Sequence, residues 1–310
     1  MTVELRPDQT TTHAPLSRVV GDRAAELRED PELFTRLLAD PQTRVLVVSG
    51  ASVPLAQASP PALHLMTFAE TGLTPAAVTG YLGRSAAGVH ILLAGVHDTA
   101  DFTTPGGWGE MRLVGGELSP EDADLGVTAV ALARWHRVAP FCPACGAKAE
   151  LRQAGWSREC TGCGRLHFPR TDPAIIVAVT DDQDRLLLGH NSMWPEGVYS
   201  LFAGFVEAGE SLEAAVVRET FEEAGVAVHD IAYGSSQAWP YPQSIMVGFF
   251  ARAADADSAR PDGAEILSVR WFAREELDEA MAGRGPIRIP ASASIARSLI
   301  NQWHAGAAQQ

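Results

Sequence analysis

The sequence predicts a mixed α/β (α+β) protein of three consecutive parts. They are a mixed N-terminal domain over residues 1–138, a four-cysteine segment over residues 139–168, and a second α/β domain over residues 169–310. Three observations support this prediction. The 310 residues suffice for about two domains, all cysteines fall between Cys142 and Cys163, and apolar β-branched runs alternate with helix-forming stretches. With 46% hydrophobic and 20% charged residues, a folded core is expected rather than disorder.

The first part begins with a polar leader over residues 1–20 and then shows mixed signals without a catalytic motif. A short helix is expected over Pro31–Ala39, and buried strands are expected over Arg44–Val48 and Val89–Val96. The segments Gly80–Gly88 and Thr103–Gly109 are rich in turn residues, so turns are expected there.

A longer helix is predicted to begin after Ser119 and to run to about His136. Ser119 is a suitable N-cap, Pro120 suits the first position, and two acids occupy the first turn. Its buried face is expected to contain Leu125, Ala129, Leu132 and Trp135 or His136. Because the helix ends just before the cysteines, we expect it to be a stiff connector.

Charge and hydropathy exclude several classes of function. The net charge of −14 argues against a general binder of DNA or of membrane surfaces, since phosphate backbones select basic faces. A phosphate substrate remains compatible, because a divalent cation can bridge carboxylates to phosphates. No apolar run approaches the ~20 residues of a membrane span, and Met1–Pro15 lacks the apolar core of a signal peptide. A cytoplasmic protein is expected.

The four cysteines form two C-x-x-C pairs, each followed by a glycine that suits a tight turn. Four thiolates make a closed tetrahedral shell for zinc, without an open position for catalysis. We therefore predict one structural Zn²⁺ per chain at Cys142, Cys145, Cys160 and Cys163. The alternative of a nucleic-acid-binding ribbon is weaker, because four basic and two acidic residues leave the segment a net charge of only +2.

In the last part, strands are expected over Ala174–Val179, Arg185–Leu188, Tyr199–Ala203, Ile231–Ser235, Ile245–Ala251 and Val269–Phe272. A final helix with Ile295, Leu299 and Trp303 on one stripe is expected to close the domain.

Between these strands lies a glycine loop and then a helix that Ser211 caps and Gly225 ends. Glu219, Glu222 and Glu223 stand at i, i+3 and i+4, which places three carboxylates on one helix face. A hard cation such as Mg²⁺ or Mn²⁺ would relieve their repulsion. A solvated acidic face is the simpler alternative, but it leaves the glycine loop and Arg218 unexplained. The buried stripe is expected to contain Leu212, Ala215, Val216 and Phe221.

This stretch resembles the Nudix box, which combines a glycine, a glutamate, an Arg-Glu pair, a Glu-Glu pair, a glycine and an apolar residue at fixed spacing. The matching positions are Gly204, Glu210, Arg218, Glu219, Glu222, Glu223, Gly225 and Val226. One position departs from the pattern, because Thr220 stands where an aliphatic residue is usual. The resemblance implies the Nudix α/β/α sandwich with a mixed sheet, and hydrolysis of a nucleoside diphosphate linked to another group.

Other segments resemble the zinc-ribbon NADH pyrophosphatase (NAD(+) diphosphatase) family within the Nudix superfamily. These segments are the four-cysteine ribbon, residues 167–170, residues 203–207, the aromatic loop from Ser236 to Ser244, and residues 294–300. Two positions of the loop depart from the family pattern, since Ala238 replaces a proline and Tyr241 replaces a phenylalanine. Tyr241 keeps an aromatic face, whereas Ala238 loosens the loop backbone.

The family resemblance implies the remaining site residues and the partner. Phe205 and Phe168 would sandwich the nicotinamide, Phe168 from the second subunit of a homodimer, and Glu265 would join the Mg²⁺ or Mn²⁺ ligands. Glu207 would pair with Arg218 across the loop. The predicted substrate-binding residues are Phe168, Ala203, Phe205, Glu207, Gln237, Trp239, Tyr241 and Ser244.

The implied reaction is attack of water on the pyrophosphate of NAD(H), giving a nicotinamide mononucleotide and AMP. Glu219, Glu222 and Glu223 hold the cation, Arg218 orients a glutamate, and Glu223 acts as ligand or general base. Three alternatives stay open. They are other Nudix substrates such as ADP-ribose or dinucleoside polyphosphates, the NAD-capped 5′ end of RNA, and a non-catalytic sensor or regulator.

Overall fold

The computed structural model describes Leu16 and residues 21–306. The leader expected over residues 1–20 therefore lies outside the described residues, apart from Leu16. Packing divides the chain into two compact units. Unit 1 contains residues 1–17, 172–237 and 244–310, and unit 2 contains residues 18–171 and 238–243. None of the helices in the described part of the chain has the length and apolarity that crossing a bilayer requires.

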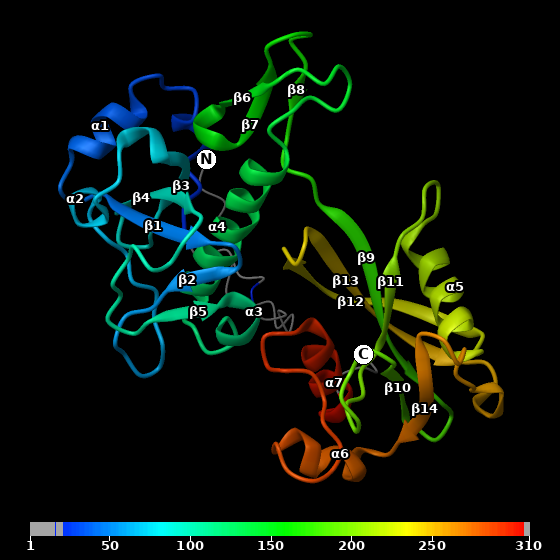
Figure 1. The fold of residues 1–310 in the computed structure, drawn as a ribbon. Coiled ribbons are helices and arrows are strands. Elements are labelled where there is room, and N and C mark those ends of the chain that lie inside the picture. The colour runs from blue at the N-terminus through cyan, green and yellow to red at the C-terminus, as the bar shows by residue number, and fades with distance from the viewer. Residues whose placement is uncertain (1–15, 17–20, 307–310) are drawn as a thin grey trace. The chain divides into compact units, whose positions relative to one another are not determined.

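Unit 2 is built on a five-stranded sheet with the order β3-β4-β1-β2-β5 (Figure 1). β1 and β4 run parallel, and the other neighbouring pairs are antiparallel. The expected strands and the expected short helix are confirmed. The strands are β1 Arg44–Ser49, β2 Ser52–Pro54, β3 Val78–Arg84, β4 His90–Val96 and β5 Trp108–Glu110. The short helices are η1 Ala25–Leu27, α1 Leu33–Ala39, α2 Phe68–Thr71, η2 Pro75–Ala77 and α3 Met111–Val114.

The turns expected over Gly80–Gly88 and Thr103–Gly109 are partly wrong. β3 continues to Arg84, and its register against β4 shifts between Val78 and Gly80 and again between Tyr81 and Gly83. The glycines thus mark irregular pairing within a strand rather than a turn, which is a common role for glycine in strands. Likewise, the end of the second segment enters β5 and pairs with β2.

The long helix α4 spans Pro120–Val138. The Ser119 side chain accepts a hydrogen bond from the Asp122 backbone N–H at 3.1 Å, which confirms the N-cap. Leu125, Ala129, Leu132 and Trp135 are buried as expected. The connector role needs correction, because α4 packs against β1, β3 and β4 and buries nine residues. The helix is a layer of the unit 2 core.

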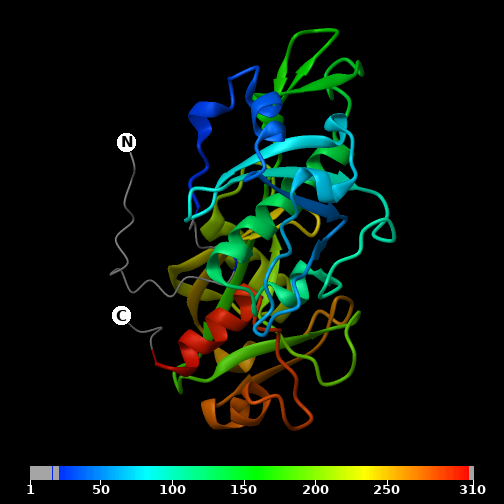
Figure 2. The ribbon, with the colours of Figure 1, turned by 90° about the vertical axis from the view of Figure 1, so that its left-hand side faces the viewer.

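The cysteine segment forms a small three-stranded antiparallel sheet, which Figure 2 shows as a separate green layer of unit 2. Its strands are β6 Ala149–Arg152, β7 Ser157–Cys160 and β8 Leu166–His167, and the single turn η3 Gln153–Gly155 joins β6 to β7. The Arg158 guanidinium is anchored to this unit by donating to the carbonyls of Ala149 and His136, at 2.7 and 2.6 Å.

Unit 1 contains a mixed sheet with the order β12-β13-β9-β10-β14, and β11 also pairs with β9. β13 runs parallel to β9, whereas β10 and β11 run antiparallel to it. The strands are β9 Asp172–Thr180, β10 Leu186–Asn191, β11 Phe202–Phe205, β12 Val228–Trp239, β13 Ser244–Ala253 and β14 Ile266–Phe272. The helices are α5 Leu212–Ala224, η4 Ala256–Ser258, α6 Arg274–Met281 and α7 Ile295–His304.

Alternate residues of β9 contribute their side chains to two separate hydrophobic cores. Ile175, Val177 and Val179 pack with Ala215 and Val216 of α5. Ile176 and Ala178 face the other way and pack with residues of α6 and α7. Because successive side chains of a strand point to opposite faces, the sheet is covered by α5 on one face and by α6 and α7 on the other (Figure 1). The predicted α/β/α sandwich is confirmed.

Two details of unit 1 differ from expectation. The strand expected over Tyr199–Ala203 begins only at Phe202, and α6 was not expected at all. α6 spans eight residues and buries only Leu277 and Ala280, which are too few apolar positions to indicate a helix from the sequence.

Candidate functional site

The glutamate helix α5 is bounded as its sequence predicts. The Ser211 side chain accepts from the Ala214 backbone N–H at 3.1 Å, and Gly225 takes the left-handed conformation with φ 69° at the C-cap. These two ends place Glu219, Glu222 and Glu223 within the last two turns of one regular helix.

The buried stripe of α5 contains Thr220 rather than Phe221. Phe221 is 56% exposed and Thr220 is fully buried, together with Ala215, Val216 and Ala224. Nine residues separate Leu212 from Phe221, which at ~100° per residue places them on opposite sides of the helix. Expecting Phe221 in the core was therefore wrong. The unusual threonine of the box is a core residue.

Gly204 of β11 lies against the Glu219 carboxylate. A Cβ atom built on Gly204 would overlap the carboxylate carbon and both oxygens of Glu219. Glu219 can therefore hold this position only while residue 204 lacks a Cβ atom, because its carboxylate occupies the space that a methyl group needs. The first glycine of the motif acts by letting Glu219 approach the sheet.

Arg218 organises the carboxylates around it. Its Nε and Nη2 donate to the two oxygens of Glu210 at 2.8 and 2.9 Å. Its Nη1 donates to Glu219 at 2.8 Å and to Glu222 at 3.0 Å. The Arg218 guanidinium holds the pKa of Glu210 down at about 2. The expected pairing with Glu207 is wrong: Glu210, three residues later, takes that place.

Glu207 instead contributes its backbone to the loop. Its N–H donates to the Glu210 carboxylate at 3.0 Å, and its carbonyl accepts from the Glu210 N–H at 3.1 Å. This reciprocal contact presents Glu210 to Arg218. The sequence contained the signal, because Glu210 is itself a motif position.

Glu223 is the buried carboxylate of the site, with 7% of its surface exposed. Burial, together with the negative charges of Glu265, Glu219 and Asp262, raises the pKa of Glu223 to about 8. Such an accumulation of negative charge at a buried acid favours a bound cation.

Glu265 lies in the loop before β14 and close enough to Glu223 to affect its charge. The Asn191 Nδ2 donates to Glu265 Oε1 at 3.2 Å, and the Ser192 N–H donates to the Glu265 carbonyl at 2.8 Å. The Asp262 carboxylate accepts three backbone N–H groups of the same loop. Sequence reasoning missed Asn191, for which no local pattern gave a signal.

The donor set of unit 1 fits a hard divalent cation. Its four donor groups are the carboxylates of Glu219, Glu222, Glu223 and Glu265. Each ion pair of Arg218 with Glu219 and Glu222 uses one oxygen of the carboxylate. Among the described residues, their oxygens do not converge as tightly as the four cysteine sulfurs do. The residues can thus hold Mg²⁺ or Mn²⁺, while Arg218 forms ion pairs with Glu219 and Glu222.

The residues predicted to bind substrate take different positions. Phe205 is 55% exposed beside the box, as a stacking surface requires. Ala203 and Ser244 lie on β11 and β13, next to β9. Gln237 is buried, and its side chain donates to the Ala293 carbonyl and accepts from the Ile295 N–H, both at 2.8 Å. Those two bonds anchor the start of α7, which is a structural task for this residue.

Trp239 and Tyr241 of the aromatic loop belong to unit 2, as does Phe168. The Trp239 and Tyr241 rings meet edge to face, with centroids 5.0 Å apart and an interplanar angle of 84°. The Tyr241 hydroxyl is buried and has no hydrogen-bond partner among the described residues, and burial raises the pKa of Tyr241. Phe168 is 57% exposed, directly after the ribbon.

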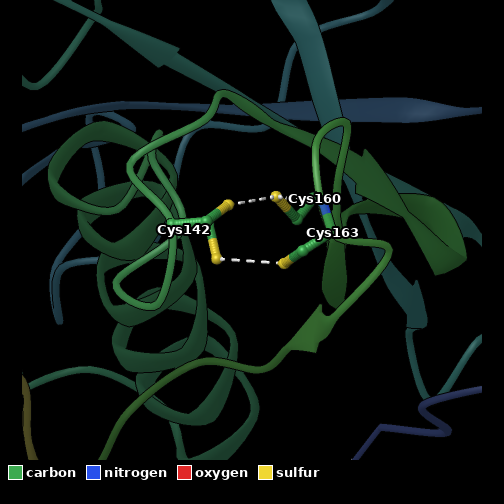
Figure 3. Close-up of side chains that lie close together, drawn as sticks. Cys142, Cys160 and Cys163 are labelled. Atoms are coloured by element: carbon green, nitrogen blue, oxygen red, sulfur yellow. Dashed lines mark hydrogen bonds between the residues drawn. The ribbon is translucent and has the colours of Figure 1, made fainter.

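The four cysteines converge on one point (Figure 3). All their sulfurs lie within 4.8 Å of one another, with 3.8 Å between Cys142 and Cys163 and 3.3 Å between Cys145 and Cys160. A tetrahedral Zn²⁺ with ~2.3 Å bonds needs sulfurs about 3.8 Å apart, so the geometry fits zinc. The backbone N–H groups of Gly162 and Cys163 point at the Cys160 sulfur, each at 3.4 Å, and lower the pKa of Cys160 to about 6. The predicted zinc ligands are brought together.

The sandwich and the carboxylate helix define a Nudix hydrolase, and two family profiles agree. A family profile described as NUDIX domain matches residues 170–290, and one described as NADH pyrophosphatase zinc ribbon domain matches residues 137–168. A solved structure of a NUDIX hydrolase from Nitrosomonas europaea aligns with 55% of this chain and 93% of its own, at 26% identity and a TM-score of 0.42.

A relative that matches over nearly its full length identifies the branch. The chain is 38% identical to the NAD-capped RNA hydrolase NudC of Mycobacterium tuberculosis (strain H37Rv). The alignment spans 312 residues and covers 94% of each protein. It is also 38% identical to the NAD-capped RNA hydrolase of Schizosaccharomyces pombe, over 60% of this chain and 55% of that protein. The protein therefore belongs to the family of Nudix hydrolases with an NADH pyrophosphatase zinc ribbon, enzymes that hydrolyse pyrophosphate bonds.

Proposed function

We propose that this enzyme cleaves the pyrophosphate of NAD(H) into a nicotinamide mononucleotide and AMP. The observation that carries the proposal is the complete carboxylate cluster on α5, where buried Glu223 meets the charges of Glu219 and Glu265. A sensor or regulator that does not catalyse has no need of this costly accumulation of charge. The zinc ribbon and the full-length relatives indicate the nicotinamide dinucleotide as substrate.

A Mg²⁺ or Mn²⁺ ion at these glutamates would neutralise phosphate oxygens and lower the pKa of an attacking water. Glu219, Glu222, Glu223 and Glu265 would hold it. Arg218 keeps Glu219 and Glu222 in place through hydrogen bonds of 2.8 and 3.0 Å. Glu223, the buried acid among these carboxylates, would serve as a ligand of the cation or as the general base.

The test is a substrate panel with purified protein and either cation. NADH, NAD⁺, ADP-ribose and a dinucleoside polyphosphate are incubated separately, and the products are separated and identified by mass. We expect NMN(H) and AMP from the first two, without inorganic phosphate. Faster use of ADP-ribose than of NADH would overturn the assignment of substrate while leaving the Nudix chemistry intact.

The NAD-capped 5′ end of RNA is the second candidate substrate. Its support is the relative that matches over 94% of both chains, which is named as an NAD-capped RNA hydrolase. The same bond would be cut. The test compares transcripts that carry an NAD cap with the same transcripts carrying a 5′-triphosphate. Release of nicotinamide mononucleotide from capped RNA alone supports this substrate.

We also propose that the protein acts as a homodimer. Three large apolar side chains of the ribbon region stay exposed in the single chain: Phe141 at 63%, Leu166 at 55% and Phe168 at 57%. Exposed apolar groups of this size are typical of surfaces that another protein covers. Light scattering after gel filtration checks the mass, and Phe168→Asp is expected to shift the dimer toward monomer.

A further inference from the structure

A cavity of about 180 Å³ opens in unit 2, and its lining includes none of the cysteines and no residue of the aromatic loop. Val48 and Val96 of β1 and β4 line it, with His97 directly after β4, and Arg134 and Arg137 come from the last turns of α4. β1 and β4 are the parallel neighbours of this sheet, so their carboxyl ends lie at the same edge. Ligands of open α/β sheets bind at such an edge.

The charge of the cavity is opposite to that of the chain. Arg134, Arg137 and His97 line it, and none of the described residues around it is acidic, although the whole chain carries a net charge of −14. Other arginines of unit 2 pair with carboxylates, such as Arg36 with Asp30 at 2.8 Å. Within residues 21–306, neither Arg134 nor Arg137 has a carboxylate partner.

Arg134 gives the more specific indication. Its Nε is buried and has no hydrogen-bond acceptor among the described residues. A buried guanidinium N–H without an acceptor is unfavourable, because it has lost its hydrogen bond to water without forming one within the protein. An anion in the cavity would balance the charge of the guanidinium, with which no carboxylate pairs within residues 21–306. Arginine binds phosphate oxygens with two parallel N–H groups, which makes phosphate the matching anion.

The backbone carbonyls at the C-terminal end of α4 do not prevent an anion from binding in the cavity. A helix C-terminus carries partial negative charge on its last carbonyls. Two of these carbonyls are already occupied, since that of Trp135 accepts from the Ala139 N–H at 3.0 Å and that of His136 accepts from Arg158 at 2.6 Å.

His136 shapes the wall and is not a binding group. Its two ring nitrogens contact Thr79 Oγ1 at 3.1 Å and the Gly155 carbonyl at 2.7 Å. Burial lowers the pKa of His136 to about 4, so the ring is neutral at physiological pH. His136 therefore adds no positive charge to that of the two arginines.

The size of the cavity limits its ligand. At about 180 Å³ it is smaller than the ~300 Å³ from which pockets for drug-sized ligands begin, so it does not enclose a dinucleotide. We propose that this cavity binds a phosphomonoester, with the phosphate held by Arg134 and Arg137 and the attached group at the mouth. The lining residues all belong to unit 2, and none is a residue of the carboxylate cluster. Binding in this cavity is therefore independent of the proposed reaction at the carboxylate cluster. The mononucleotide products of that reaction are phosphomonoesters.

Titration calorimetry of the full-length protein tests the proposal. The probes are inorganic phosphate, ribose 5-phosphate, AMP and adenosine, without added divalent cation so that the carboxylate cluster does not recruit phosphate. We expect the three phosphates to bind and adenosine not to bind. Arg134→Gln and Arg137→Gln should each weaken ribose 5-phosphate about tenfold. Arg36→Gln removes the same charge elsewhere in unit 2 and should leave the affinity unchanged.

Each result decides the question. Equal affinity for AMP and inorganic phosphate would show that the site recognises the phosphate alone, and tighter AMP binding would show that the nucleoside adds contacts. Unchanged phosphate affinity in both arginine variants, or no phosphate binding at millimolar concentration, would overturn the proposal. Arg137 is exposed, so Arg137→Gln should fold even if Arg134→Gln does not, and thermal unfolding of both variants checks this.

Discussion

Replacing Gly204 with alanine should disable catalysis without unfolding the protein. The new methyl group would overlap the carboxylate of Glu219. Non-bonded carbon and oxygen atoms rest about 3.5 Å apart, so the carboxylate must withdraw by about 1 Å or more. Because only the end of a flexible side chain has to move, the strand and its core should remain intact.

The effect on the rate follows from the displacement. A shift of about 1 Å in a catalytic group costs about a hundredfold, which corresponds to ~2.7 kcal/mol in the activation free energy. Mg²⁺ tolerates such a shift poorly, since it requires bonds of about 2.1 Å in near-octahedral geometry. We therefore expect kcat/KM for NADH to fall about a hundredfold in Gly204→Ala, with the midpoint of thermal unfolding nearly unchanged.

A double-mutant cycle tests the reason as well as the size. Initial rates with NADH are measured for Gly204→Ala, Glu219→Gln and the double variant, each over a range of cation concentrations. If the methyl group acts by displacing Glu219, adding it to Glu219→Gln should cost little more. Multiplicative losses in the double variant, or a rate near that of the parent for Gly204→Ala, would refute the reasoning.

Four further predictions concern the other features of the protein. Glu223→Gln should lower kcat by at least about a hundredfold because it removes a charge from the cation site, whereas Glu213→Gln, on the exposed side of α5, should stay within a few-fold. Elemental analysis should find one zinc per chain, and Cys160→Ser should lose it together with thermal stability; a zinc-free parent of equal stability would contradict this. Phe205→Ala should reduce kcat/KM for NADH by about ten- to hundredfold more than for ADP-ribose, because a lost ring stack costs ~1–3 kcal/mol; equal losses would mean that Phe205 only packs. His136 has a pKa of about 4 in the folded state against 6.5 for the free side chain, so the unfolded state binds the proton first as the pH falls. The free energy of unfolding should therefore drop by about 3 kcal/mol between pH 6.5 and pH 4. Urea unfolding of the parent and of His136→Gln at both pH values checks this, because the stability advantage of the parent should shrink in acid.

The sequence alone determined the features that depend on neighbours along the chain. Two C-x-x-C knuckles need only a turn of fixed length to present their sulfurs, so the zinc ligands could be named from spacing. The i, i+3, i+4 offsets of Glu219, Glu222 and Glu223 follow from the helix period, and Ser211 and Gly225 mark where that helix begins and ends. The alternation of strands and helices likewise predicted the sandwich.

The tertiary structure decided which distant groups meet. The choice of Glu210 over Glu207 for Arg218 depends on the path of a loop, and the contact of Asn191 with Glu265 joins residues 74 apart in the chain. The packing of α4 on its sheet made a core layer of an expected connector. The cavity beside Arg134 also exists only because β1, β4 and α4 come together. Such contacts depend on long-range packing, which residue type and periodicity along the chain do not specify.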